Sequence, residues 1–344
     1  IAKGAMIFLR GQVSQDLDAF IESKMAEDNI PGLAAGIVTA QGLVWAKGYG
    51  MANVEAGRRV DTNTIFALMS ISKMVTAAGV MQQVEAGRLD LKADINSYFD
   101  GVTLRPGVPF TIENPSARGT ITLEHLLSHT SGIAGDDYGV LQLNIATSDA
   151  ALQPLGEMLG SLLHPEGTRY DGGNHYSDNA PGMSFTYSSI GISLAAYAAE
   201  VVLQTGFDEL TKTNIFDRLG MVKTSWRLSH FDGDRDAVAV MYNPIDDGAI
   251  HEPIDAFTFA EYPAGTLRSN VPELARFLAT MINGGTYSNR QILSPASVAA
   301  METPPFPDAM NGNSYGLGMF IVDDDLRAHG GDDTIIFEEV LRVE

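Results

Sequence analysis

The sequence contains no cysteine, few basic residues and no long apolar run. Without cysteine it has no disulfide, no thiolate nucleophile and no cysteine-ligated zinc site. Its 344 residues carry 43 acidic and 22 basic side chains, a formal net charge of −21. This charge argues against nucleic acid or an anionic membrane surface as a partner. No segment approaches the roughly 18 consecutive apolar residues of a membrane-spanning helix.

The remaining composition is that of a globular protein, with 45% hydrophobic and 19% charged residues. The chain is long enough for two lobes, each with its own core. Residues 5–9 form an apolar run too short for the core of a signal peptide. The absence of cysteine suits a periplasmic or secreted protein, and a cytoplasmic location is also compatible with it.

Hydrophobic periodicity predicts a helical middle flanked by strands. Helices are expected over residues 12–28, from about 70 to 85, 122–127, 148–162, 190–202 and 271–282, and from 294 onwards. Strands are expected over 33–40, 43–50 and 315–322 and within 328–337. This order predicts an α/β lobe, residues 12–65 and 220–344, interrupted by a mostly α-helical lobe, residues 66–219. The long polar loop 133–186 is expected to act as a lid or binding wall.

Ser70 and Lys73 stand three residues apart at the head of a predicted helix. Residues at this spacing share one helical face, so the lysine amine can reach the serine hydroxyl. A serine becomes a nucleophile when a nearby base takes its proton, and S-x-x-K is a known nucleophile motif. A chain of this length is expected to contain about one such match by chance, so further motifs must decide.

Four later stretches follow SISK (70–73) and form an ordered set of motifs with it. They are LLSHTSG (126–132), YSS (187–189), PAGTLRS (263–269) and HGG (329–331). The chain thereby resembles the serine β-lactamase and penicillin-binding-protein superfamily from about residue 12 to 337. It is most similar to the class C-like branch, which includes D-Ala-D-Ala carboxypeptidases, D-aminopeptidases and family VIII carboxylesterases. The resemblance implies an antiparallel sheet flanked by helices plus the inserted α-helical lobe.

The resemblance also implies a catalytic set. Ser70 would be the acylated nucleophile, Lys73 its partner, and Tyr187 the general base or acid. A tyrosine does this near neutral pH only if a cation lowers its pKa, and Lys73 and His329 are the candidate cations. The backbone N–H groups of Ser70 and Asp332 would form the oxyanion hole.

Substrate would be bound by Ser189, His329, Gly330 and Gly331, two of which depart from the family pattern. Ser189 stands where β-lactamases carry an asparagine, and serine has fewer hydrogen-bond donors. His329 replaces the lysine that pairs with a substrate carboxylate, and neutral histidine is a poor counter-ion. Both changes favour small esters or amides over penicillins. Because relatives continue into further strands and a helix, we expect the C-terminal end of the α/β lobe to be incomplete.

The sequence therefore predicts a serine acyl-hydrolase of the esterase, D-amino-acid peptidase or amidase type, with small-molecule substrates and no cofactor or metal. One alternative is a β-lactamase or D-Ala-D-Ala carboxypeptidase. Another is a non-catalytic penicillin-recognition or scaffold protein. The sequence leaves the oligomeric state open.

Other features read as structural. Asp232, Asp234 and Asp236 have calcium-loop spacing but lack the glycine and terminal glutamate of that loop, so we expect a solvated loop. His129 is expected to be a structural residue beneath the Ser70 helix rather than part of a triad. His164 and His175 are expected at the surface. The sequence has no H-E-x-x-H or Walker motif.

Overall fold

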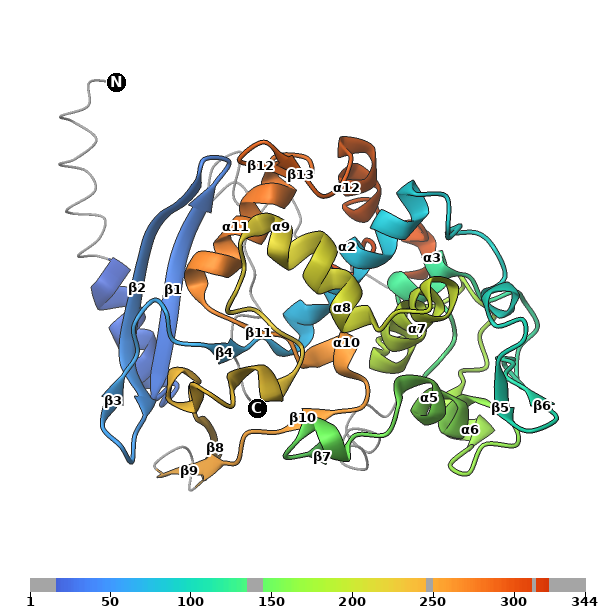
Figure 1. Cartoon of the computed structure of the whole chain (residues 1–344), viewed down its shortest axis with the longest axis horizontal. Coiled ribbons are helices and arrows are strands. Elements are labelled where there is room, and N and C mark those ends of the chain that lie inside the picture. The colour runs from blue at the N-terminus through green and yellow to red at the C-terminus, as the bar shows by residue number, and fades with distance from the viewer. Residues whose placement is uncertain (1–16, 135–144, 246–249, 311–313, 322–344) are drawn as a thin grey trace.

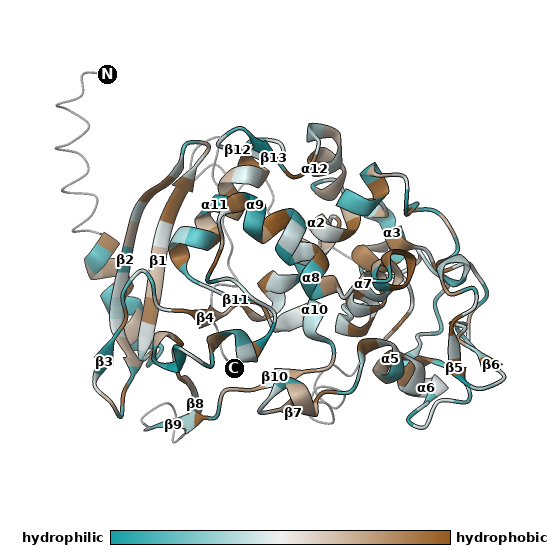
Figure 2. Cartoon of the chain, in the orientation of Figure 1, coloured by the Kyte–Doolittle hydropathy of each residue, from teal (hydrophilic) through white to brown (hydrophobic). Residues whose placement is uncertain are grey.

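The computed structural model describes residues 17–134, 145–245, 250–310 and 314–321. At one end lies a long antiparallel hairpin of β1 (Gly32–Thr39) and β2 (Gly42–Asn53), extended by β3 (Arg58–Arg59) into a three-stranded sheet (Figure 1). The hairpin turns at Gly42, whose φ of +105° favours glycine. Helix α11 (Val271–Ile282) packs on both long strands, where Gly36 leaves room for the Val271 side chain. Figure 2 shows apolar segments along both strands.

The centre of the molecule is α2 (Ser72–Glu85), which is buried on nearly every side. A helix that is enclosed in this way needs small or apolar side chains all round rather than one stripe. Ala77, Ala78 and Gly79 allow neighbouring elements to approach closely, and a Cβ on Gly79 would lie 2.9 Å from the Phe207 ring. Helix α7 (Ser189–Leu203) and the short α10 (Tyr262–Gly265) both pack against α2. This arrangement holds the start of α2 in a fixed place.

The remaining elements surround this core. Further helices are α3 (Leu123–Leu127), α5 (Leu155–Leu163), α6 (Gly172–His175), α8 (Phe207–Thr211), α9 (Asp217–Leu219) and α12 (Pro295–Met301). The 3-10 helices are η1 (Met69–Ile71), η2 (Ile95–Tyr98), η3 (Asp149–Ala151), η5 (Leu228–Phe231), η6 (Arg235–Ala237) and η7 (Pro307–Ala309), and the π-helix is η4 (Lys212–Phe216). Five two-stranded pairs complete the described fold: β4 (Phe66–Ala67) with β11 (Arg268–Ser269), β5 (Thr103–Arg105) with β6 (Val108–Pro109), β7 (Ile145–Ala146) with β10 (Thr258–Phe259), β8 (Met241–Ile245) with β9 (Ile250–Ile254), and β12 (Thr286–Tyr287) with β13 (Arg290–Gln291).

Much of the predicted secondary structure is confirmed. The hairpin and the helices near 72–85, 123–127, 155–163, 190–202, 271–282 and 295–301 are all present. The first predicted helix is helical over residues 17–27 within the described part of the chain. The α/β fold class is confirmed, whereas the two-lobe boundaries and the lid role of 133–186 stay predictions. The strand predicted within 328–337 lies outside the described residues.

The strand predicted over 315–322 is wrong within its described part. Tyr315 and Phe320 form only an isolated bridge, and the chain bends between them. Gly318 adopts a φ of +79°, and its N–H donates to the Leu127 carbonyl at 2.8 Å. A Cβ on Gly318 would lie 2.4 Å from Ala77 Cβ. The bend therefore results from glycines that let this segment close against α2.

The prediction that His164 and His175 lie at the surface is also wrong. They are 6% and 8% exposed. Nδ1 of His164 accepts the Glu166 N–H, and Nδ1 of His175 lies 3.0 Å from the Leu162 carbonyl oxygen. Backbone groups thus pair with Nδ1 of both rings inside a stretch whose composition looks polar.

Within the described residues, no single helix is long and apolar enough to cross a membrane. One pair, Ser189–Leu203 with Phe207–Leu219, meets the length and composition criteria together but is bent by 85°.

Candidate active site

Ser70 lies at a turn between a short strand and the central helix. The segment just before Ser70 is held by the β4–β11 pairing and by the Leu68 N–H, which donates to the Leu267 carbonyl at 2.8 Å. Met69 then adopts a φ of +43°, a left-handed conformation that non-glycine residues rarely take. Such strain persists only where the surrounding structure imposes it, and it concentrates at functional sites. Ser70 follows in a 3-10 turn, half-buried, rather than within α2 itself.

Lys73 lies one turn further on, with only 2% of its surface exposed. Its ammonium donates to Ser70 Oγ at 3.0 Å and to the carbonyl oxygen of Ala264 at 3.0 Å. Ala264 belongs to α10. The Thr76 hydroxyl also binds this short helix, because it donates to the Pro263 carbonyl at 2.6 Å. The S-x-x-K spacing therefore produces the predicted serine–lysine contact. The role of the Ala264 carbonyl was not predicted, although the PAGTLRS motif marked that segment.

Tyr187 joins this pair from the segment that leads into α7. Its ring centroid lies 4.8 Å from Lys73 Nζ, and the ring is half-buried. Ser188 is the N-cap of α7, because its side chain accepts the Gly191 N–H at 3.0 Å. Ser189 is the first residue of that helix and is half-buried. The structure thus brings Ser70, Lys73 and Tyr187 together, as the motifs predicted.

His129 is buried, as predicted, and lies against Tyr187, with ring centroids 4.4 Å apart. Burial, and to a lesser extent the charge of Lys73, holds the pKa of His129 well below the usual value of 6.5. The ring is therefore neutral at neutral pH. Its Nδ1 accepts the Ser188 N–H at 3.1 Å, so this nitrogen has a structural partner rather than the triad role considered above.

An exposed aromatic ring stands beside Tyr187. Phe320 is 45% exposed, and its ring is nearly parallel to that of Tyr187, at 6.5 Å between centroids and 12° between planes. Phe320 was not predicted as a site residue, because it lies in a segment whose pattern predicts a strand. The predicted substrate-binding residues His329, Gly330 and Gly331 and the predicted oxyanion donor Asp332 lie outside the described residues.

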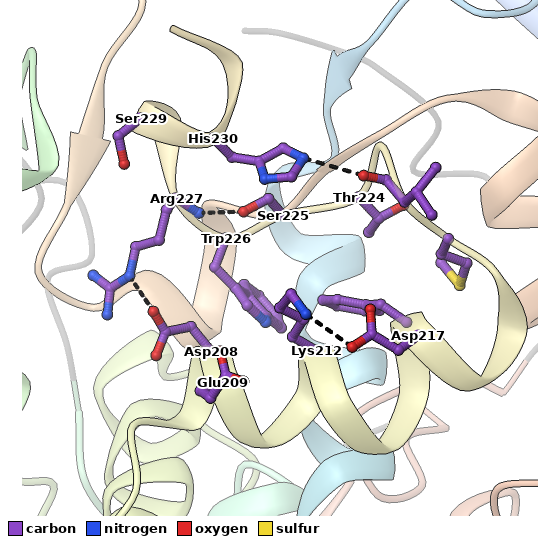
Figure 3. Close-up of a pocket in the computed structure, with 13 residues that line it drawn as sticks. Asp208, Glu209, Lys212, Asp217, Thr224, Ser225, Trp226, Arg227, Ser229 and His230 are labelled. Carbon is purple, nitrogen blue, oxygen red and sulfur yellow. Dashed lines mark hydrogen bonds and ion pairs between the residues drawn. The ribbon is translucent and has the colours of Figure 1, made fainter. Parts of the chain in front are cut away.

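A separate hollow of about 310 Å³ lies between η4, α8 and the segment 221–230 (Figure 3). Buried Trp226 and Phe216 contribute to its lining. Four of its charged side chains form two ion pairs: Arg227 with Asp208 at 2.5 Å, and Lys212 with Asp217 at 2.8 Å. The hollow contains none of the predicted site residues, so the serine–lysine–tyrosine group is the candidate active site.

The described ranges show no group of three or more acidic or histidine side chains suited to hold a metal ion. Asp232, Asp234 and Asp236 are exposed, as expected, and Asp232 pairs with Arg235.

Comparison with known proteins agrees with this geometry. A family model described as Beta-lactamase matches residues 17–337. Among curated relatives, Protein flp of Staphylococcus aureus (strain MRSA252) is 22% identical over 329 residues, covering 94% of this chain and 59% of the relative. Penicillin-binding protein 4 of Amycolatopsis lactamdurans is 27% identical over 195 residues, covering 57% of this chain and 44% of the relative. The chain thus spans about 59% of the flp length.

Solved structures show the same fold. The octameric penicillin-binding protein homologue from Pyrococcus abyssi superposes with a TM-score of 0.69 at 26% identity, covering 89% of this chain and 64% of that one. The β-lactamase/D-alanine carboxypeptidase from Pseudomonas syringae gives a TM-score of 0.67 at 22% identity, covering 89% of this chain and 74% of that one. EstCE1, a hydrolase with promiscuous acyltransferase activity, gives a TM-score of 0.69 at 19% identity, covering 93% of this chain and 86% of that one.

Proposed function

The chain belongs to the β-lactamase family of serine hydrolases, and from this premise we propose that it hydrolyses small esters or amides through an acyl-enzyme at Ser70. The observation that supports this most is the contact of the buried Lys73 amine with Ser70 Oγ at 3.0 Å. A buried lysine is costly unless it is used or well paired, because water no longer solvates its charge. Its hydrogen bonds to Ser70 and Ala264 point it at the serine.

In the proposed reaction, Ser70 Oγ attacks the substrate carbonyl carbon while its proton passes to Lys73 Nζ when that lysine is a neutral amine, or to the Tyr187 phenolate when Lys73 is charged. The Ser70 N–H is proposed to stabilise the developing oxyanion, together with the N–H predicted at Asp332. The leaving alcohol or amine takes up the proton, and Tyr187 is the proposed donor. Water then attacks the acyl carbon, the same residues accept its proton, and the acid is released with Ser70 restored.

The proposed preference for uncharged esters rests on three residues. Ser189 and His329 replace the asparagine and lysine with which β-lactamases and D-peptidases bind an acyl amide and a carboxylate. Phe320 adds an exposed apolar ring beside Tyr187, which suits an apolar acyl or alcohol group. A histidine at 329 supplies a fixed cation only when it is protonated. Penicillins should therefore be poor substrates at neutral pH.

A second candidate function is β-lactamase or D-Ala-D-Ala carboxypeptidase activity. Its support is the 27% identity to a penicillin-binding protein over 57% of this chain. A non-catalytic penicillin-recognition protein is the third, and it is disfavoured because the intact serine–lysine–tyrosine geometry would then have no use.

One substrate screen separates these candidates. The wild type and a His329→Lys variant are assayed on short-chain p-nitrophenyl esters, a chromogenic cephalosporin and D-Ala-D-Ala peptides at fixed ionic strength. We expect ester hydrolysis in the wild type and a shift towards carboxylate-bearing substrates in the variant, about tenfold for each 1.4 kcal/mol gained. Penicillin or cephalosporin hydrolysis as fast as ester hydrolysis in the wild type would replace the esterase proposal with the β-lactamase alternative.

A further inference from the structure

His129 holds the backbone on both sides of Tyr187. Its carbonyl oxygen accepts the Thr186 N–H at 2.7 Å, and its ring Nδ1 accepts the Ser188 N–H at 3.1 Å. Between these two bonds, the His129 ring packs against the Tyr187 ring at 4.4 Å between centroids. Tyr187 is thus bracketed by one residue that comes from a different part of the chain, between α3 and the loop that follows.

The ring chemistry shows that packing alone does not explain a histidine here. Because Nδ1 accepts a hydrogen bond in a neutral imidazole, the proton must be on Nε2. Nε2 is buried and has no hydrogen-bond partner among the described residues. A buried donor without an acceptor destabilises the fold. An apolar ring in this space would therefore cost less folding free energy than the histidine does. The benefit that offsets this cost is the Nδ1 bond to Ser188.

The backbone conformation narrows the residues that could do the same. His129 has a φ of +58°, a region in which histidine, asparagine and aspartate are enriched and other non-glycine residues are strained. The ring is enclosed by Tyr187, by Tyr315 at 4.7 Å and by Phe185 at 5.8 Å between centroids. Asparagine can keep both the left-handed conformation and an acceptor near Nδ1, whereas phenylalanine keeps only the ring.

We propose that His129 is a positioning residue, which sets the Tyr187 phenol relative to Lys73 and Ser70 by holding the backbone on either side of the tyrosine. The inference rests on the function proposed above, since it concerns the proton-transfer geometry of the same site. It assigns His129 no contact with substrate. It predicts that losing the Nδ1 acceptor lowers kcat by moving Tyr187, while substrate binding changes little.

The test compares His129→Asn, which keeps an acceptor, with His129→Phe, which keeps only the ring. A matched control is His125→Asn, four residues earlier, where the ring stacks on Phe306 at 4.7 Å and bonds to the Thr122 side chain. Each variant is first checked for folding by thermal melting. Then kcat and KM are measured on one p-nitrophenyl ester, well below the lowest melting temperature, across the pH range.

For His129→Phe we expect kcat to fall by about 10- to 100-fold, the loss expected when a reacting group is displaced by about 1 Å. KM should stay within about threefold, because uniform substrate binding is retained. His129→Asn should recover most of the lost kcat, and His125→Asn should lower the melting temperature without this loss in kcat. Unchanged kcat in His129→Phe, or equal losses in the Phe and Asn variants, would overturn the proposal.

A second readout keeps the proposal separate from the proposed function. The phenol of Tyr187 is titrated by ultraviolet difference absorbance, with the Tyr187→Phe protein as the blank. In His129→Phe, we expect this titration to shift from that of the wild type, because the phenol would sit differently relative to the Lys73 charge. Identical titration curves in the wild type and His129→Phe would overturn the positioning role, whether or not the wild type hydrolyses the ester. A wild type that hydrolyses no ester would instead refute the proposed function.

Discussion

Replacing Tyr187 by phenylalanine isolates a single hydroxyl in the proposed mechanism. The ring keeps its contacts with His129 at 4.4 Å and Phe320 at 6.5 Å, and it still lies 4.8 Å from Lys73 Nζ. The fold and the serine–lysine contact should therefore persist. If the hydroxyl transfers protons, its loss should lower kcat by about 10²- to 10⁴-fold. That range corresponds to roughly 3–5 kcal/mol in the activation barrier.

The assay is steady-state hydrolysis of a short-chain p-nitrophenyl ester, with burst kinetics to separate acylation from deacylation. Tyr315→Phe is the matched control, because Tyr315 is a buried tyrosine whose ring also packs on His129, at 4.7 Å. The control should keep kcat within about tenfold of the wild type, since Tyr315 has no part in the proposed proton transfers. A Tyr187→Phe enzyme that loses less than tenfold, or no more than the control, would refute the proton-transfer role.

Three further predictions follow from the packing. Gly318→Ala should lower the free energy of unfolding by about 1–3 kcal/mol in urea titrations, because its Cβ would lie 2.4 Å from Ala77 Cβ; Gly101→Ala, with the same left-handed φ of +80° but open space, should cost less. Because burial lowers the pKa of His129 below 6.5, His129 binds a proton in the unfolded chain at a pH where it stays neutral in the folded protein. The free energy of unfolding should therefore fall as pH falls below 6.5, by up to about 1.4 kcal/mol per pH unit. The His129→Asn protein should show a shallower slope between about pH 7 and pH 5, and an identical slope would count against this reasoning. Phe320→Ala should lower kcat/KM by about tenfold for esters with long apolar groups and little for acetyl esters, and an equal effect on both would contradict an apolar contact.

The sequence was sufficient for the serine–lysine–tyrosine group because each member lies in a short motif. Ser70 and Lys73 are one turn apart, so local geometry alone predicts their contact. The position of Tyr187 beside them depended on the family resemblance, since a Tyr-Ser-Ser stretch has no local signature of catalysis. The β1–β2 hairpin and α11 were equally accessible to prediction, because alternation and helical periodicity are local patterns.

Features that depend on long-range packing were missed. The bend between Tyr315 and Phe320 looks like a strand by composition, yet Gly318 turns it against α2. The Ala264 carbonyl that holds Lys73 has no side-chain signal at all. His175 is buried with its ring against the Leu162 carbonyl, thirteen residues earlier, a contact that only the folded chain makes. Periodicity reports which face of an element is apolar, and it does not report which backbone groups meet across the core.

The most direct measurement of the central claim is the site of covalent modification. The wild type and Ser70→Ala are incubated separately with a fluorophosphonate probe and a p-nitrophenyl ester, and intact and peptide masses are recorded at short times. We expect one adduct on the wild-type peptide that contains Ser70. In Ser70→Ala we expect neither an adduct nor turnover, with an unchanged melting profile. An adduct on another serine, or ester hydrolysis retained by Ser70→Ala, would contradict it.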